Sequence, residues 1–480
     1  MDRQFIEQSV DRHAKEIFRV SDAIWEAAEL AFTEYRSAEL LCEALKANGF
    51  TVEKGLAQIE TAFKGTFGSG KPVIGFLGEF DALSGLSQEA GALEKRPVTA
   101  GGNGHGCGHN LLGTASLLAA IACKEYLEEK KLPGTIVYFG CPGEEGGSGK
   151  AFMAKAHVFD ELDLALTWHP GNANCVASGS SLANIQVKYH FHGVSAHAAA
   201  CPHLGRSALD AVELTDVGAN YLREHILPEA RIHYAITDTG GVMPGVVQSY
   251  AEVLYLLRAP KLDQVQDIYE RMNNIAKGAA LMTGTSVEID FMKACSDVVP
   301  NSVLEQVLFK AMTQEALPEY TEEELEYAKA LCATISDPDD YAKEAAENMP
   351  FDEREAFLKK CKGPVLNLVL PYVHKEKASA NSTDVGDVSH VCPTAQIGTA
   401  TWVNGTAVHS WQAASQGKGS IAQKGLLLAA RVLAAGAMYC MEEPETVKKA
   451  KEEYRARTGG SFISPIPDGA HPRKLSSDSR

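Results

Sequence analysis

Several features that mark specialised classes of protein are missing from this chain of 480 residues. No apolar run reaches the roughly 18 residues that a membrane-spanning helix needs, and no charged-then-apolar signal segment opens the chain. The eleven cysteines are odd in number and scattered, so they do not form the paired framework of a disulfide-rich secreted protein. Positive charge is also scarce, because the formal net charge is −17. We therefore expect a cytoplasmic protein with mostly reduced thiols, and neither nucleic acid nor a membrane as partner.

The composition that remains is that of an ordinary globular protein. Hydrophobic residues make up 45% of the chain and charged residues 22%, which is typical of packed domains. The length allows two or three domains with sizeable cores.

Three short apolar runs predict buried strands of one sheet, at 73–77, 135–140 and 164–168. Helical segments at 110–127 and about 149–158 separate them, and this alternation is typical of a parallel sheet in an α/β domain. Polar residues follow each run, at the edge where open α/β sheets bind ligands. We expect a mixed, largely parallel sheet flanked by helices.

The pattern changes near residue 182 to a β-α-β-β-α-β order, which resembles the ferredoxin-like split unit. We predict that 182–293 is a lid or dimerisation domain inserted between two parts of a catalytic domain, 1–181 and 294–480. Within the second part, residues 315–362 are rich in Glu, Asp, Lys and Ala. This stretch predicts a solvated helical excursion, with a second lid as the alternative.

The last part of the chain returns to the sheet. Strand-like runs at 366–370 and 396–402 complete it, and a long helix at 417–440 closes the fold. The tail from Gly459 is rich in Pro, Ser and Gly, and we predict no regular fold for it.

The glycine-rich stretch GGNGHGCGHN at 101–110 places Cys107 and His109 two residues apart, directly before an expected helix. A thiolate and an imidazole on a loop that can wrap an ion suit a transition metal. The helix N-terminus would favour the thiolate form of Cys107. Taken alone, the motif is explained equally well by a buried free cysteine and a loop histidine.

Five metal-capable positions stand out, and we expect all of them in loops: Cys107, His109, Glu145, His169 and His409. The adjacent carboxylates Glu144 and Glu145 repel if both are ionised, which raises the proton affinity of one unless a cation holds the other. With Glu145 on a metal, Glu144 is left facing the metal-bound water as a general base. A Glu-Glu pair is more often a solvated turn, but the strand before it and the glycines around it favour a site here.

In combination these motifs resemble the aminoacylase and carboxypeptidase family of co-catalytic metallopeptidases, in the branch that hydrolyses N-acyl and amide-linked amino acids. The resemblance runs in the same order from about residue 15 to 440. It is carried by GHGCGHN at 104–110, Glu144-Glu145, His169-Pro170, GVSAHAA at 193–199, STDVGDV at 382–388 and VHSW at 408–411.

The resemblance implies that the five positions above bind two divalent metal ions, manganese or zinc. It implies that Glu144 is the general base and that Asp81 orients a ligand histidine through its second ring nitrogen. His197 matches the lid histidine that reaches the partner subunit's site and stabilises the oxyanion. Arg258 matches the lid arginine that binds the substrate carboxylate.

One position departs from the family pattern. The family usually has an asparagine where this chain has Gly245, so backbone groups must replace its hydrogen bonds or the substrate is held differently. For Arg258 the alternative is a surface arginine at the end of a strand.

The implied activity is hydrolysis of the amide between an aromatic acyl group and an amino acid, with p-aminobenzoyl-glutamate as the expected substrate. Other N-acyl amino acids or dipeptides, such as indole-acetyl-aspartate, are the alternative within this class. Other classes are a catalytically silent metal-binding scaffold subunit, against which the intact Glu144 argues, and a plain binding protein for acyl-amino acids. We expect a homodimer or a hetero-oligomer with a related subunit.

Overall fold

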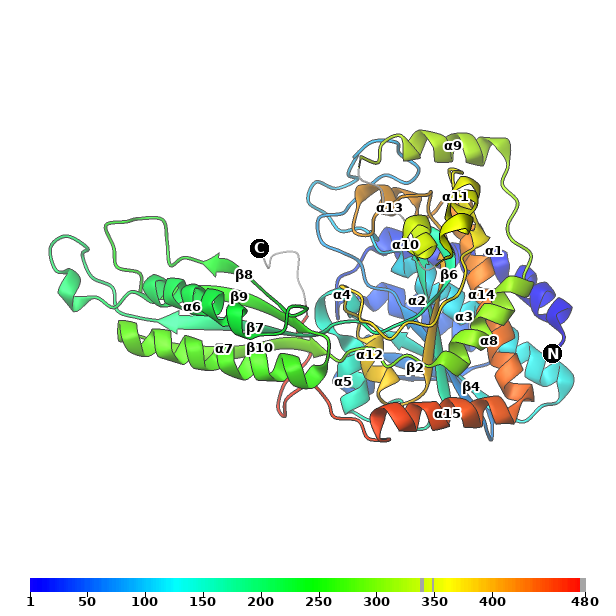
Figure 1. Cartoon of the computed structure of the whole chain (residues 1–480), viewed down its shortest axis with the longest axis horizontal. Coiled ribbons are helices and arrows are strands. Elements are labelled where there is room, and N and C mark those ends of the chain that lie inside the picture. Colours follow the sequence, from blue (N-terminus) through cyan, green and yellow to red (C-terminus); the bar gives the residue numbers. More distant parts are fainter. Residues whose placement is uncertain (337–340, 348, 475–480) are drawn as a thin grey trace.

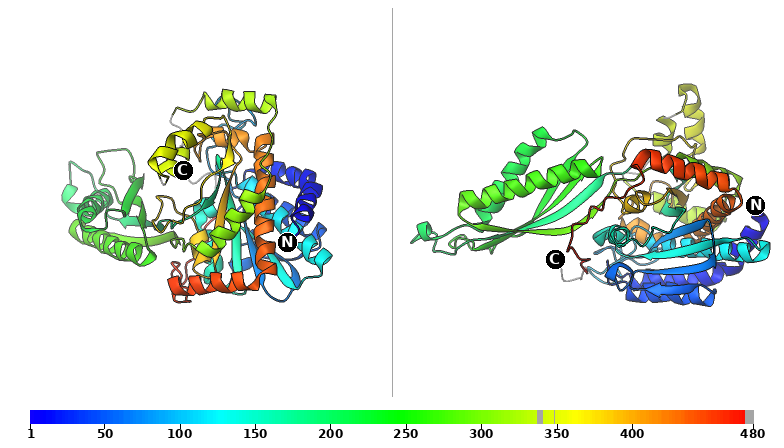
Figure 2. Two further views of the ribbon diagram at one scale, coloured as in Figure 1. Left: turned by 45° about the vertical axis from the view of Figure 1, so that its right-hand side comes forward. Right: turned by 90° about the horizontal axis from the view of Figure 1, so that it is seen from below.

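The computed structural model describes residues 1–336, 341–347 and 349–474. A larger body contains an eight-stranded mixed sheet, and a smaller unit with a four-stranded antiparallel sheet projects from it (Figure 1). Both views in Figure 2 show the same projection, so the chain is elongated rather than spherical.

The strands of the larger sheet lie in the order β1-β2-β4-β3-β5-β12-β6-β11. Their bounds are β1 (Thr51–Lys54), β2 (Phe63–Ser69), β3 (Val73–Glu79), β4 (Gly134–Cys141), β5 (Leu164–Gly171), β6 (Ala173–Ala177), β11 (Leu366–Val369) and β12 (Thr394–Ala400). The neighbours β4, β3, β5 and β12 run parallel. β2 is antiparallel to both of its neighbours, and β6 is antiparallel to β12. The expected mixed, largely parallel sheet flanked by helices is confirmed.

Helices cover both faces of this sheet (Figure 1). The longer ones are α1 (Arg3–Ala27), α2 (Tyr35–Ala47), α3 (His109–Lys130), α8 (Ser302–Gln314), α14 (Ser420–Glu442) and α15 (Pro444–Thr458). The shorter ones are α4 (Glu144–Gly147), α5 (Gly149–Lys155), α12 (Val385–Ser389) and α13 (Trp411–Gln416). The helices α1, α3 and α14 pack on one face, and α5 and α12 pack on the other.

Strand β3 shows why the sequence forms a central strand. Every one of its residues is buried, because helices cover both faces. Ile74 and Phe76 point to the core under α1, α3 and α14, whereas Val73 and Leu77 point to the core under α5. Helix α14 is long and apolar enough to cross a membrane, but 78% of its most apolar window is buried inside the protein. We interpret α14 as a core helix.

The smaller unit contains β7 (Ala183–His192), α6 (Ala208–Leu222), β8 (Arg231–Asp238), β9 (Tyr250–Ala259), α7 (Leu262–Thr283) and β10 (Ser286–Cys295). The strand order is β10-β7-β9-β8, and both helices pack against the sheet. Of the predicted domain limits, 182 directly precedes β7 and 293 falls within β10. That this unit is a separate lid or dimerisation domain stays a prediction.

The acidic stretch 315–362 forms α9 (Glu322–Cys332), α10 (Tyr341–Glu347) and α11 (Phe351–Lys360). These helices expose most of their residues, and few side chains, such as Leu331 and Phe357, are buried. Residues 337–340 and 348 of this stretch lie outside the described residues.

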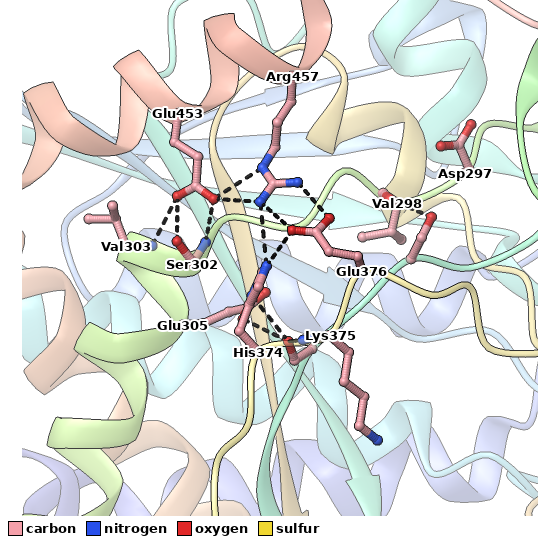
Figure 3. Close-up of polar contacts among 12 residues, drawn as sticks. Asp297, Val298, Ser302, Val303, Glu305, His374, Lys375, Glu376, Glu453 and Arg457 are labelled. Atoms are coloured by element: carbon pink, nitrogen blue, oxygen red, sulfur yellow. Dashed lines mark hydrogen bonds and ion pairs between the residues drawn. The ribbon is translucent and has the colours of Figure 1, made fainter. Parts of the chain in front are cut away.

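Helix α15 was not expected from the sequence, because only Val447 and Ala450 of its residues are buried. Ionic contacts fix it instead (Figure 3). Glu453 accepts the backbone N–H groups of Ser302 and Val303 at the start of α8, at 3.0 and 3.1 Å. Arg457 joins Glu453 to Glu376, with Nη2 2.9 Å from an oxygen of each. Strands β1, β2 and β6 and helix α8 also went unpredicted.

Candidate metal centre

The C-terminal edge of the parallel strands brings together residues from separate parts of the sequence. Asp81 follows β3, Glu144 and Glu145 follow β4, His169 lies in β5, and the loop that carries His409 follows β12. The expectation that all five metal-capable residues lie in loops is wrong for three of them. His109 begins α3, Glu145 lies in α4, and His169 is part of β5, so regular elements with fixed backbones position these side chains.

Cys107 lies at the centre of the cluster. Two groups of ligand atoms each lie within 4.8 Å of one another: Cys107, His109 and His169 form one, and Cys107, Glu145 and His409 form the other. The Sγ atom of Cys107 is 3.4 Å from Nε2 of His169. Cys107 is therefore common to both groups, and these soft and borderline donors fit metal ions that the two groups would hold.

Asp81 holds two members of the cluster at once. Its Oδ1 is 3.0 Å from Nδ1 of His109, and its Oδ2 accepts the backbone N–H of Glu145 at 3.0 Å. The contact at Nδ1 directs Nε2 of His109 toward Cys107 and His169. This Nε2 is buried and accepts or donates no hydrogen bond among the described residues, although Oε2 of Glu79 lies 3.2 Å away. Such a nitrogen is available as a metal ligand.

The other two histidines are also held for ligation. Nδ1 of His169 lies 2.7 Å from the carbonyl of Pro170, which leaves Nε2 free for a metal. His409 adopts a left-handed backbone conformation with φ of 59°, and its N–H donates to the carbonyl of Gly106 at 2.8 Å. Its Nε2 is 3.2 Å from Oε1 of Glu145, a buried oxygen that forms no hydrogen bond within the part of the chain that the structure describes. The orphaned atoms of His109 and Glu145 fit a bound cation.

The two adjacent glutamates differ strongly in proton affinity. Burial, and then the carboxylates of Glu79, Asp384 and Glu145, raise the pKa of Glu144 well above its usual value. Burial alone would also raise the pKa of Glu145, but His409 and His109 lower it to about 2. This separation is what a general base at Glu144 and a metal ligand at Glu145 would require.

The expected thiolate at Cys107 is not produced by the protein alone. Burial, and then the Glu145 carboxylate, raise the pKa of the Cys107 thiol well above its usual value. The dipole at the start of α3 is too weak to offset these two effects. A cation bound at the site would deprotonate the thiol, so the donor set fits a metal that supplies the missing positive charge.

The sequence reasoning missed a charged group directly behind the cluster. Glu79, the last residue of β3, places Oε2 3.2 Å from Nε2 of His109. Lys150 places Nζ 2.8 Å from Glu79 and 2.5 Å from Asp384. In the sequence, a glutamate at the end of the apolar run 73–77 is a signal that could have identified Glu79.

The two lid residues lie at opposite ends of the four-stranded sheet. Arg258 pairs with Asn184 near the larger body, whereas His192, just before the loop that carries His197, pairs with Tyr250 at the far end. These pairs lie eight residues apart along each strand, which corresponds to about 27 Å. The loop with His197 follows the end of β7 that is remote from the larger body, so the structure does not bring His197 to the metal centre of its own chain. The four-stranded sheet projects away from that body (Figures 1 and 2).

His197 is exposed, and its Nδ1 accepts the backbone N–H groups of Ala199 and Ala200 at 3.2 Å. This arrangement places the proton of the neutral ring on Nε2, where it can be donated to an oxyanion. Arg258 instead contacts the larger body, with Nη1 3.4 Å from the carbonyl of Ala380 and from Oγ of Ser382.

Gly245 is not needed for steric reasons. A Cβ at this position would meet no atom within 4 Å. Its carbonyl accepts the N–H of Ala198, the residue after His197, at 2.9 Å. The backbone at Gly245 thus supports the loop that carries His197.

Residues 75–385 match the family model for Peptidase family M20/M25/M40. The chain belongs to this family. It is 46% identical over 98% of its length to the B subunit of p-aminobenzoyl-glutamate hydrolase from Escherichia coli (strain K12), and the match covers 99% of that protein. It is 32% identical to the Xaa-Arg dipeptidase of Mus musculus, over 62% of this chain and 68% of that protein.

Two further relatives match a smaller share of this chain. The A subunit of p-aminobenzoyl-glutamate hydrolase from Escherichia coli (strain K12) is 28% identical over 57% of this chain and 73% of its own. Indole-3-acetyl-aspartic acid hydrolase of Enterobacter agglomerans is 29% identical over 52% and 60%.

Solved structures share the fold of this M20 chain. An aminobenzoyl-glutamate utilization protein from Klebsiella pneumoniae matches with a TM-score of 0.58 at 18% identity, over 89% of this chain and 98% of that one. A dinuclear metal binding peptidase of the M20 family from Bacillus subtilis matches with a TM-score of 0.52 at 15% identity, over 89% and 99%. The M20 chain is a metal-dependent hydrolase of amide or peptide bonds.

Proposed function

We propose that this M20 hydrolase cleaves p-aminobenzoyl-glutamate to p-aminobenzoate and glutamate with two divalent metal ions, manganese or zinc. The observation that carries the proposal is the pair of ligand groups that share Cys107 and lie beside Glu144. The identity of 46% over nearly the whole chain to one component of a p-aminobenzoyl-glutamate hydrolase supports the substrate. The ions would be held by Cys107, His109 and His169 on one side and by Cys107, Glu145 and His409 on the other.

Bound ions would supply Lewis acidity that polarises the amide carbonyl and makes water more acidic. Glu144 takes the proton of the attacking water and passes it to the leaving amine nitrogen, so that the amide bond breaks and a free carboxylate and amine form. Its raised pKa suits both steps, because the group must first accept a proton and then release it. Asp81 keeps His109 and the backbone of Glu145 in place throughout.

We also propose that His197 acts at the site of a partner subunit, in a homodimer or in a hetero-oligomer with a related chain. Its exposure and its distance from the metal centre of its own chain support this assignment. The neighbouring edge strand β8 exposes Tyr234 and Ile236, with Val242 and Met243 in the loop after it, and such apolar exposure is typical of an interface. For the substrate carboxylate we propose Arg258, which would have to leave its weak contacts with Ala380 and Ser382.

A second candidate function is hydrolysis of other N-acyl amino acids or dipeptides. The similarity to an indole-3-acetyl-aspartic acid hydrolase and to an Xaa-Arg dipeptidase favours it. Comparing kcat/KM for glutamate-linked, aspartate-linked and arginine-linked substrates distinguishes the two. We propose the cytoplasm as the cellular location, because the eleven cysteines are scattered and odd in number, as in proteins whose thiols stay reduced.

The test of the proposed function is release of glutamate from p-aminobenzoyl-glutamate by the purified chain with added manganese or zinc. Wild type, Glu144→Ala and the control Glu355→Ala are assayed together with their metal content, Glu355 being an exposed residue of α11. We expect turnover by wild type and control, and a loss of 10²–10⁴-fold in Glu144→Ala at unchanged metal content. Equal turnover by all three would contradict the role of Glu144. A metal-loaded wild type without turnover would point to a missing partner chain or to another acyl group.

A further inference from the structure

A wholly buried lysine lies behind the metal centre. The Lys150 side chain has no exposed surface, and its two ionic partners, Glu79 and Asp384, are buried as well. The backbone N–H of Lys150 also donates to Oδ2 of Asp384, at 2.8 Å. Burying three charges is costly unless they are paired in a fixed geometry, so all three side chains are held firmly.

The two carboxylate oxygens of Glu79 contact different neighbours. Oε1 faces Lys150 at 2.8 Å, and Oε2 lies 3.2 Å from Nε2 of His109. Nδ1 of the same imidazole ring is occupied by Asp81 at 3.0 Å. The His109 ring therefore lies between two carboxylates, one that orients it and one beside its metal-facing nitrogen.

A second carboxylate of the cluster also approaches Glu79. Glu79, His109 and Glu144 form a third group whose ligand atoms lie within 4.8 Å of one another. Two carboxylates this close repel unless a cation lies nearby, and the Lys150 ammonium, 2.8 Å from Glu79, provides that charge.

We propose that Lys150 is a positioning residue that acts through Glu79 on the ion held by His109 and His169. The lysine fixes Glu79 beside Nε2 of His109. Because His109 belongs to only one of the two ligand groups that contain Cys107, the negative charge of Glu79 acts on the ion of that group. The inference rests on the proposed two-ion centre. It predicts that the two ions differ in their dependence on Glu79 and Lys150.

The test is a titration of the metal-free full-length protein with Co²⁺, followed by the visible absorption of the bound ion. The variants are Glu79→Gln, which keeps the shape of the side chain, and Lys150→Met. The matched control is Glu315→Gln, which removes a buried carboxylate paired with Arg3 in another part of the body. We expect Glu79→Gln to weaken one of the two binding steps by 10–100-fold and to leave the other step and the control unchanged.

Lys150→Met should weaken the same step. If this variant fails to fold because it leaves two buried carboxylates unpaired, the double variant Glu79→Gln/Lys150→Met removes one of them and should show the same single weakened step. Two unchanged steps in Glu79→Gln, or equal weakening in Glu79→Gln and Glu315→Gln, would overturn the inference while the two-ion centre stands. Failure of the wild type to bind Co²⁺ would overturn the centre and the inference together.

Discussion

Most of the candidate functional side chains at the edge of the larger sheet are buried or nearly so, whereas the one at the far end of the four-stranded sheet is exposed. At the first, Cys107, His109 and Glu145 are buried or nearly so, and the ligand atoms of His109 and Glu145 each lie within 4.8 Å of the thiol of Cys107. At the second, His197 is exposed, and only the amides of its own loop contact its ring nitrogen. The comparison agrees with our proposal that one chain holds the metals and that a complete site would need His197 of a second chain.

The difference has a physical origin. A buried ligand cluster costs free energy unless a cation compensates the desolvated donors, so its members must be positioned by a rigid sheet edge. An exposed histidine carries no such cost and can be presented to a partner on a loop. The following changes test this contrast, beginning with the largest expected effect.

Replacing the shared thiol should abolish the metal centre. We expect Cys107→Ala to lose both ions and to reduce turnover by at least about a thousandfold, because several kcal/mol of transition-state stabilisation depends on the ions. His409→Ala, which removes a ligand from one group only, should retain one ion. Metal analysis by mass spectrometry measures both. Retention of two ions by Cys107→Ala would refute the bridging role.

The exposed histidine should act in trans. We expect His197→Ala to lower kcat on the order of 10²-fold through loss of an oxyanion donor. Mixing it with Glu144→Ala and allowing subunits to exchange should restore about a quarter of wild-type activity, because mixed dimers contain one intact site. An absence of restored activity, with subunit exchange verified by native mass spectrometry, would place His197 in the site of its own chain.

Buried carboxyls should make stability depend on pH more strongly in the body than in the smaller unit. Burial raises the pKa of Asp387 in α12 to about 7 and that of Asp216 in α6 to about 6. A raised pKa favours the folded state at low pH, so its contribution is complete below about pH 4 and is lost as the pH rises through the folded value.

Through Asp387, the wild type should lose up to about 4 kcal/mol of its free energy of unfolding between pH 4 and 8. We expect this loss to be absent in Asp387→Asn. Asp216→Asn should have a smaller effect on this pH dependence. Calorimetric unfolding of the metal-free protein across this range measures both effects. A pH dependence that is the same in wild type and Asp387→Asn would show that Asp387 is not the group responsible.

The smallest effect is expected at Gly245. Gly245→Asn should change the free energy of unfolding by less than about 0.5 kcal/mol, because the new Cβ meets no atom within 4 Å. The hydrogen bond from Ala198 to the carbonyl is retained. Thermal unfolding checks this, and a fall in KM would show that a side chain here assists recognition. A loss of several degrees in Tm would contradict the open environment.

Much of the fold could be predicted because its signals are local. The apolar runs of β3, β4 and β5 and the periodic apolar positions of the long helix α14 are written in consecutive residues. Helix α15 carried no such signal, because its packing depends on Glu453 and Arg457 finding partners in α8 and at Glu376. Strand β6 was missed because it is short, Ala173–Ala177, and both of its partners, β11 and β12, come from a distant part of the sequence.

For the metal centre, the sequence alone determined which residue types were available and, through their motifs, which family they resemble. It determined the adjacent pair Glu144-Glu145, but not which of the two would have a raised pKa. Only the tertiary structure decided that Cys107 lies in both ligand groups and that Lys150 and Glu79 lie behind His109. It also decided that the loop with His197 follows the end of β7 that lies about 27 Å from the pair formed by Arg258. The reason is physical: residue type is local, whereas burial, charge proximity and distance depend on segments that meet only when the chain folds.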